Sequence, residues 1–320
     1  MSDAPTGQGR GKLALRVLLT VALVAALVWR VPVRDVGAAL KIIPPTGVAL
    51  AVAMLALQIV LGAWRWKRML ARVGEAQPLG ALVVDTLIAS AYNLVLPSTV
   101  GGDVIRAMRC GKRLNANHAA FSTTLFERMV GLPTLALVAA PGILVVPGGQ
   151  VLVWPTVAFA VVSVLAVIVA KAPLAWLAKL ASSRAPAVTG VASGMSADLA
   201  GPLATLGTRA EAFGWTLLYQ AAGISILAAF VAPSGDWRLI AAIYAGLPLI
   251  VVATMLPVTI AGIGLRESLF VVVLGRLGVP EATALALSVL WFATFFAIAA
   301  PGVVLVLLEG RGKRSVEADR

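Results

Sequence analysis

The sequence has little charge, one cysteine and one histidine. Charged residues make up 12% of its 320 residues, whereas hydrophobic residues make up 60%. With Cys110 alone, the chain can form neither an internal disulfide nor a metal site built from several cysteines. His118 is expected to be a surface or capping residue rather than part of a proton relay. So small a share of charge excludes an ordinary soluble domain.

Long apolar stretches fill most of the chain, and its mean hydropathy is +0.96. A helix needs about 20 apolar residues to cross a hydrocarbon core of about 30 Å. We expect one transmembrane domain over residues 1–320, with no soluble domain. The first span is interpreted as an anchor, because no small residues for signal cleavage follow it. The expected spans are 13–29, 46–64, 119–146, 151–170, 212–232 and 282–308.

One short segment occurs twice. Residues 96–106 read LPSTVGGDVIR, and residues 256–266 read LPVTIAGIGLR. The two copies lie 160 positions apart, which is half the length of the chain. Each copy places a proline and glycines in an apolar stretch, where they interrupt a helix. We therefore expect two related halves, at about 13–146 and 151–308.

The Lys and Arg residues gather beside the expected spans and so indicate orientation. Most of the 26 fall on one side if both termini are cytoplasmic. Both termini lie on the same side only if the number of crossings is even. The six expected spans meet this condition if the broken segments 79–113 and 240–278 enter and leave on the same side, as re-entrant hairpins. The predicted fold is an all-α polytopic membrane protein with six full spans and two re-entrant broken-helix hairpins, arranged as inverted repeats. A plain eight-helix bundle with kinked helices is the alternative.

The net charge of +12 is assigned to topology and contact with lipid. The basic residues do not line one amphipathic face, so nucleic acid is not an expected partner. The expected partner is a membrane phospholipid or glycolipid.

Ionisable side chains at membrane depth cost about 2.5 to 3.5 kcal/mol on insertion scales, so each is a candidate for function. At Gly101 and Gly102, backbone N–H groups at a helix start can bind a phosphate. Alternatively, Asp103 caps that helix and pairs with Arg106 at i,i+3. The candidate substrate-binding residues are Asn93, Gly101, Gly102, Asp103, Arg106, Glu127, Arg128, Arg266 and Glu267.

Glu127 and Arg128 are adjacent in an expected span, so they point in different directions and need partners on other elements. In one interpretation, Arg128 contacts a headgroup and Glu127 ties its helix to a hairpin. In the other, both form interhelical salt bridges near the cytoplasmic interface. Arg266 and Glu267 pose the same question in the second half.

Three motifs carry a resemblance to a known family. They are residues 92–97 with 101–106, residues 126–132, and Pro257 with 262–267. The chain resembles the flippase-like transmembrane domain of lysylphosphatidylglycerol synthases, which also occurs alone. The resemblance implies movement of an anionic phospholipid or a lipid-linked sugar across the cytoplasmic (inner) membrane. The synthases continue into a soluble domain whereas this chain ends soon after its last span, so aminoacyl transfer is not expected.

The alternative function is a membrane enzyme or an accessory protein in polyprenyl-phosphate glycolipid or cell-envelope synthesis. In an enzyme, Asp85 and Asp103 would be the carboxylates for a metal, although no D-x-D or histidine signature accompanies them. As an accessory protein, the chain would work beside a separate glycosyltransferase or lipid synthase. We expect no catalytic residue, no cofactor and no metal site.

Overall fold

The computed structural model describes residues 33–41, 43–95, 100–169, 186–255 and 263–318, and it is a bundle of helices without a strand in these ranges. The all-helical prediction is therefore confirmed. The helices are α2 (Val33–Lys41), α3 (Pro45–Arg72), α4 (Leu79–Val95), α5 (Val100–Leu114), α6 (Asn117–Val145), α7 (Val153–Val169), α9 (Pro186–Ala200), α10 (Leu206–Val231), α11 (Trp237–Thr254), α12 (Leu265–Gly275) and α13 (Glu281–Ala318). Short 3₁₀ helices at Gly149–Leu152, Pro202–Ala204 and Ala232–Ser234 join some of them.

Within the described ranges, five helical stretches are long and apolar enough to cross a membrane. Four of them, in α3, α6, α10 and α13, coincide with predicted spans. The fifth, α11, lies in a segment predicted to be re-entrant, and its 18 residues reach about 27 Å. The predicted span 151–170 corresponds to α7, which belongs to the shorter apolar helices. The predicted span 13–29 lies outside the described residues.

Each broken segment contains two helices. The first, 79–113, forms α4 and α5, and the second, 240–278, forms α11 and α12. The second part of each repeated segment begins a helix, with 100–106 in α5 and 265–266 in α12. Residues 96–99 and 256–262 of these segments lie outside the described part of the chain.

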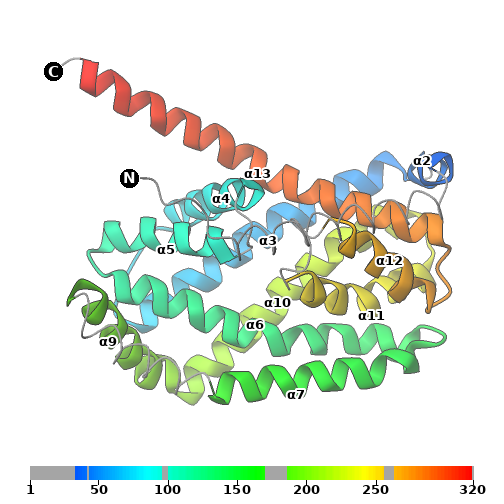
Figure 1. The fold of residues 1–320 in the computed structure, drawn as a ribbon, viewed down its shortest axis with the longest axis horizontal. Coiled ribbons are helices and arrows are strands. Elements are labelled where there is room, and N and C mark those ends of the chain that lie inside the picture. The colour runs from blue at the N-terminus through cyan, green and yellow to red at the C-terminus, as the bar shows by residue number, and fades with distance from the viewer. Residues whose placement is uncertain (1–32, 42, 96–99, 170–185, 256–262, 319–320) are drawn as a thin grey trace, which may run out of the picture.

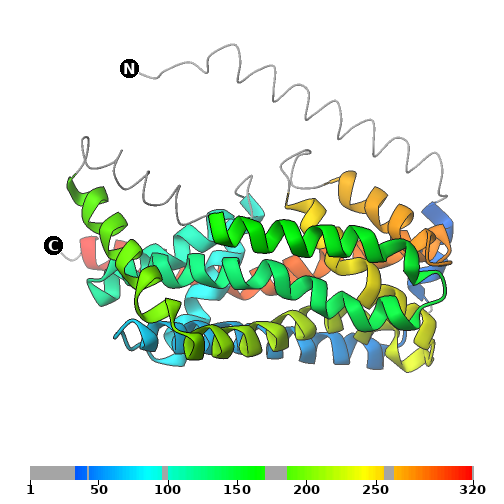
Figure 2. The same cartoon turned by 90° about the horizontal axis from the view of Figure 1, so that it is seen from below.

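Helices α3 and α10 pack on each other and run in opposite directions. Arg68 and Arg72, near the end of α3, bind Glu211 near the start of α10. At the other end of the crossing, Gly47 of α3 lies against the backbone of Phe230. Figure 2 shows the two helices running side by side along the lower edge of the bundle.

The α3–α10 crossing has a reciprocal packing arrangement. Tyr219 of α10 lies over Gly62 of α3, and Gln58 of α3 lies over Gly223 of α10. A Cβ atom at Gly62 would approach the Tyr219 ring to 3.0 Å, and one at Gly223 would overlap the Gln58 amide. Each helix therefore supplies one large side chain and one glycine to the same interface.

Two further crossings bring backbones into contact. Helix α11 packs on α6 and α13 packs on α4, as Figure 1 shows for α13 above α4. A Cβ atom at Gly142 of α6 would overlap the backbone of α11, and one at Gly302 of α13 would overlap the Leu87 carbonyl of α4. Pro141 and Pro301 precede these glycines inside their helices and remove one helical hydrogen bond each.

Many large apolar side chains are exposed on the outer helices. On α7, the residue Val162 is 63% exposed, and on α13, Leu307 is 61% exposed. Exposed apolar surface of this extent is unfavourable in water. It suits a bundle surrounded by the hydrocarbon of a membrane.

Candidate functional site

The centre of the candidate site is the carboxylate of Glu127 on α6. Its Oε1 accepts a hydrogen bond from Arg65 Nε of α3 at 2.8 Å, and its Oε2 accepts one from Arg106 Nη2 of α5 at 2.8 Å. All three residues are buried. Hydrogen-bonded pairs of opposite charge are what permits burial of such groups. One carboxylate thus joins three helices.

Aromatic rings hold both arginines in place. The Arg65 guanidinium lies 4.5 Å from the centre of the Tyr219 ring, and that of Arg106 lies 4.7 Å from the centre of the Trp66 ring. Trp66 is itself fixed, because its Nε1 donates to Thr123 Oγ1 at 3.0 Å. Cation–π contacts of this kind stabilise a desolvated guanidinium. The arginines therefore have little freedom to move.

Asp103 extends the chain of charges toward the surface. Its Oδ1 lies 3.3 Å from Arg106 Nε, and its Oδ2 accepts from Arg128 Nε at 2.6 Å. The Arg128 side chain is 43% exposed. We call Arg65, Glu127, Arg106, Asp103 and Arg128 the arginine cluster. Three arginines and two carboxylates leave one net positive charge, with Arg128 at the accessible end.

Gly101 and Gly102 lie beside this cluster at the start of α5, and Asn93 faces them from the end of α4. Gly102 N donates to Asn93 Oδ1 at 2.8 Å, so this N–H is bonded within the protein. Asp103 lies in the first turn of α5, not before it. The interpretation of Asp103 as an N-cap is therefore wrong, because its carboxylate binds arginines while Asn93 satisfies the helix start. The i,i+3 pairing of Asp103 with Arg106 is present.

Replacing Asn93 by alanine should destabilise the protein by about 0.5 to 2 kcal/mol, the usual cost of losing a side-chain cap. Thermal unfolding in detergent measures this change. Asn93→Asp is the matched control, because it keeps an acceptor oxygen and adds a negative charge at a helix start. Equal melting temperatures for Asn93→Ala and the unaltered protein would contradict the capping role.

Arg266 and Glu267 lie apart from the arginine cluster, at the start of α12. Arg266 is buried, binds Glu267, and lies 4.1 Å from the centre of the Phe292 ring. Glu267 Oε2 also accepts from Gly264 N at 2.7 Å. The adjacent residues Glu127 and Arg128 bind different partners, whereas the adjacent residues Arg266 and Glu267 bind each other.

Arg65 is the member of the cluster that was not predicted from the sequence. It lies near the end of a span, where an arginine normally reaches the interface. The buried residues of α3 include Gly62, Arg65, Trp66 and Met69, which recur at helical spacing. That periodicity is the signal that places Arg65 on the inward face.

A second set of charges surrounds Asp85, which is fully buried on α4. Asp85 Oδ1 accepts from Arg109 Nε at 3.0 Å and from Arg113 Nη1 at 2.9 Å. Arg109 also donates to both carboxylate oxygens of Glu309 on α13, at 2.9 and 2.7 Å. Asp85 and Asp103 thus bind different arginines and do not form a carboxylate pair. In the described residues, no three His, Cys, Asp or Glu side chains are grouped as metal ligands.

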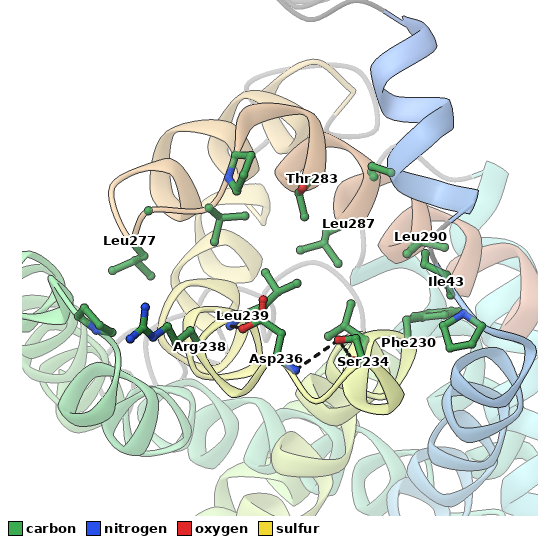
Figure 3. Close-up of a pocket in the computed structure, with 18 residues that line it drawn as sticks. Ile43, Phe230, Ser234, Asp236, Arg238, Leu239, Leu277, Thr283, Leu287 and Leu290 are labelled. Carbon is green, nitrogen blue, oxygen red and sulfur yellow. Dashed lines mark hydrogen bonds between the residues drawn. The ribbon is translucent and has the colours of Figure 1, made fainter.

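A pocket of about 580 Å³ opens at the opposite end of the bundle. Figure 3 shows it between α10, the start of α11, the α12–α13 turn and the segment after α2. Its lining is mostly apolar, with Ser234, Asp236, Arg238 and Thr283 as polar members. Asp236 N donates to Ser234 Oγ at 3.3 Å. Volume and lining match those of sites for small amphiphilic molecules.

The helices and their exposed apolar surfaces define a multi-pass membrane protein with a buried charged cluster. A comparison with protein families gives the particular family. Residues 13–302 match the family described as "Lysylphosphatidylglycerol synthase TM region", and the chain belongs to it. A comparison with curated proteins gives no match. Membership supports a membrane role in lipid metabolism or transport.

Proposed function

We propose that this protein moves a lipid with an anionic headgroup, either a phospholipid or a lipid-linked sugar, between the leaflets of the cytoplasmic (inner) membrane. The observation that carries the proposal is the arginine cluster. It combines one net positive charge with an accessible end at Arg128. Phosphate oxygens bind arginine through paired hydrogen bonds. In a membrane domain of this family, a lipid phosphate is the anion best suited to that cluster.

The proposed orientation has both termini in the cytoplasm. Basic residues gather at the ends of α3 and α5: Lys67, Arg68, Arg72, Arg109, Lys112 and Arg113. We call this end of the bundle the basic face, and the positive-inside rule assigns it to the cytoplasm. Arg65 lies seven residues before the end of α3, about 10 Å from it along the helix axis. A headgroup from the cytoplasmic leaflet would therefore reach the arginine cluster first.

The proposed architecture is a pair of inverted repeats. Adding 160 to the bounds of α3 gives 205–232, and α10 spans Leu206–Val231. The same offset relates Pro141-Gly142 of α6 to Pro301-Gly302 of α13. Helices α3 and α10 run in opposite directions, as expected for inverted copies. The hairpins of the proposal are α4 with α5 and α11 with α12.

The packing between the halves supports the same proposal. If the halves correspond, α6 matches α13 and α11 matches α4. The contact of α6 with α11 then has its counterpart in the contact of α13 with α4, and both are present. Each is made at a Pro-Gly pair, where the helix backbones touch.

The two halves differ at the charged cluster. At the 160-residue offset, Arg106 corresponds to Arg266, but Glu127 corresponds to Leu287. Arg266 binds its neighbour Glu267 instead. In transporters with repeats, the binding site lies where broken helices of the two halves meet. Here the first half supplies the charges, and α10 of the second half supplies Tyr219.

In the proposed binding step, the lipid phosphate replaces Asp103 as the partner of Arg128. This exchange conserves the number of ionic hydrogen bonds at Arg128 while the acyl chains stay in the membrane. Glu127 keeps Arg65 and Arg106 paired throughout. A relative movement of the two repeats then exposes the headgroup to the other leaflet, where the apolar pocket lies.

Arg128→Ala should lower the initial rate of lipid transport at least tenfold, because an ionic hydrogen bond contributes about 1.5 to 3 kcal/mol and 1.4 kcal/mol is tenfold. The measurement is headgroup accessibility in proteoliposomes. The probes are fluorescent phosphatidylglycerol, its aminoacylated form and a polyprenyl-phosphate sugar. The fold should be unaffected, since the side chain is 43% exposed.

Arg209→Ala is the control, because Arg209 is an exposed arginine near the start of α10. Transport by Arg128→Ala at the rate of this control would overturn the site assignment. If the unaltered protein moved none of the three lipids, the transport proposal would fail. The accessory role beside a glycosyltransferase or lipid synthase would then be tested by adding that enzyme.

A further inference from the structure

A second ionic structure closes the basic face. Arg109 of α5 donates from Nε to Asp85 of α4 and from both terminal nitrogens to Glu309 of α13. Arg113 reinforces the contact with Asp85. We call Asp85, Arg109, Arg113 and Glu309 the clasp. A fork of parallel hydrogen bonds between Arg and carboxylate is both strong and directional, so the clasp fixes α13 against the α4–α5 pair.

Helix α5 supplies residues to both the clasp and the arginine cluster. Arg106 binds Glu127 of α6, and Arg109, three residues further on, binds Asp85 and Glu309. Residues three apart lie on neighbouring parts of a helix surface. Any displacement of α5 from α13 therefore also moves the helix that carries Asp103 and Arg106. The two sets of charges are mechanically connected through one short helix.

The end of α13 that carries Glu309 can bend relative to the rest of the helix. At Gly302, α13 touches the backbone of α4, and Pro301 just before it removes a helical hydrogen bond. Such positions are where helices kink. Glu309 lies seven residues beyond Gly302, so bending there swings it toward or away from Arg109. Figure 1 shows α13 passing over α4 and extending beyond the bundle.

The positions that correspond to the clasp in the other half carry no charge. At the 160-residue offset, Asp85, Arg109 and Glu309 correspond to Ala245, Leu269 and Gly149, none of which can form an ion pair. The end of the bundle opposite the basic face contains the pocket of about 580 Å³. Among the described residues, the clasp thus lies at the basic face and the pocket at the other end. A closed basic face with a pocket at the other end is what one of the two states of an alternating-access transporter is expected to have.

We infer that the clasp is a gate: it is closed in this structure, and α13 separates from α5 there to admit a lipid headgroup to the arginine cluster. This inference rests on the proposed function. It adds that entry from the basic face requires the Arg109–Glu309 contact to break. Breaking this contact costs little free energy, because the two side chains are 28% and 47% exposed. Water can therefore replace the lost hydrogen bonds.

The first test holds the gate shut. In a Cys110→Ala background, Arg109→Cys and Glu309→Cys are joined by a short bifunctional methanethiosulfonate reagent that a reductant can cleave. Crosslinking should lower lipid transport in proteoliposomes at least tenfold, and the reductant should restore it. Each single-cysteine variant, treated with the same reagent, is the control. Unchanged transport by the crosslinked protein would overturn the gate.

The second test needs no transport. Thr216 is fully buried beside Arg65, so Thr216→Cys in the Cys110→Ala background reports access to the cluster. Glu309→Gln should speed its reaction with a water-soluble maleimide about fivefold, near the upper limit for an exposed ion pair. Glu211→Gln is the control, because it weakens an ionic contact of the same face that joins α3 to α10.

The two readouts separate the two proposals. If Glu309→Gln speeds labelling but the unaltered protein transports none of the probe lipids, the gate stands and the proposed function fails. If transport is measured but neither crosslinking nor Glu309→Gln has an effect, the function stands and the gate is wrong.

Discussion

Glu127→Ala is expected to be the most destabilising substitution in the candidate site, by about 3 to 5 kcal/mol. The alanine variant leaves Arg65 and Arg106 buried without the carboxylate that bridges them. Two buried guanidinium groups would then repel each other across the gap. The measurement is thermal unfolding in detergent, with the fraction of protein that remains monodisperse as the readout.

The matched control for Glu127→Ala is Glu211→Ala. Glu211 also binds two arginines, Arg68 and Arg72, but both are more than 40% exposed. Water can solvate them after the carboxylate is lost, so the cost should stay near 1 kcal/mol or below. Equal losses of stability in the two variants would show that burial does not set the strength of the Glu127 contacts.

A triple variant distinguishes stability from function. Glu127→Leu, which introduces the residue found at the corresponding position Leu287, is combined with Arg65→Met and Arg106→Met and removes the three buried charges of the cluster. Replacing a buried ionic group as a whole by apolar residues is often neutral or stabilising. The triple variant should regain most of the stability that Glu127→Ala loses, while transport is lost with the buried charges of the arginine cluster.

Gly302→Ala should destabilise the protein by about 1 to 3 kcal/mol, the usual cost of overpacking a close contact. The added Cβ overlaps the carbonyl oxygen of Leu87, which is backbone and cannot rotate away. Helices α13 and α4 would have to separate at the crossing. Gly142→Ala should act in the same way, because the new Cβ overlaps the backbone of α11.

The control for Gly302→Ala is Gly214→Ala in α10. A Cβ at Gly214 meets no atom within 4 Å, so alanine there should stabilise the helix by up to about 1 kcal/mol. The two substitutions are chemically identical and should change the melting temperature in opposite directions. A Gly302→Ala protein as stable as Gly214→Ala would contradict the close crossing of α13 and α4.

Much of the helical framework was predictable from the sequence, because a span is set by the length of an apolar stretch. The predicted span 119–146 differs from α6 by two residues at its start and one at its end. The end of α3 was less predictable: the apolar stretch stops at 64, but the helix continues to Arg72. Its last two turns are basic and are stabilised by contacts of Arg68 and Arg72 with α10, which hydropathy does not report.

The candidate site was predictable only as a set of residues, not as an arrangement. Burial of charge in apolar segments identified Asp103, Arg106, Glu127 and Arg128, which the structure brings together. Arg65 was not identified, because its partner Glu127 lies 62 residues away. Pairing of this kind depends on which helices are neighbours. The second motif copy led to Arg266, whose different partners follow from Leu287 standing where the first half has Glu127.

The reciprocal crossing of α3 and α10 constrains how this sequence can change. The Gln58 amide occupies the space above Gly223, and the Tyr219 ring lies against Gly62, so a side chain added at either glycine would displace the group that faces it. A larger residue at either glycine becomes acceptable when the side chain opposite it becomes smaller. Tolerated substitutions at this interface should therefore occur in pairs, one at the glycine and one at the side chain that faces it. Each glycine and its facing side chain should thus change together during evolution.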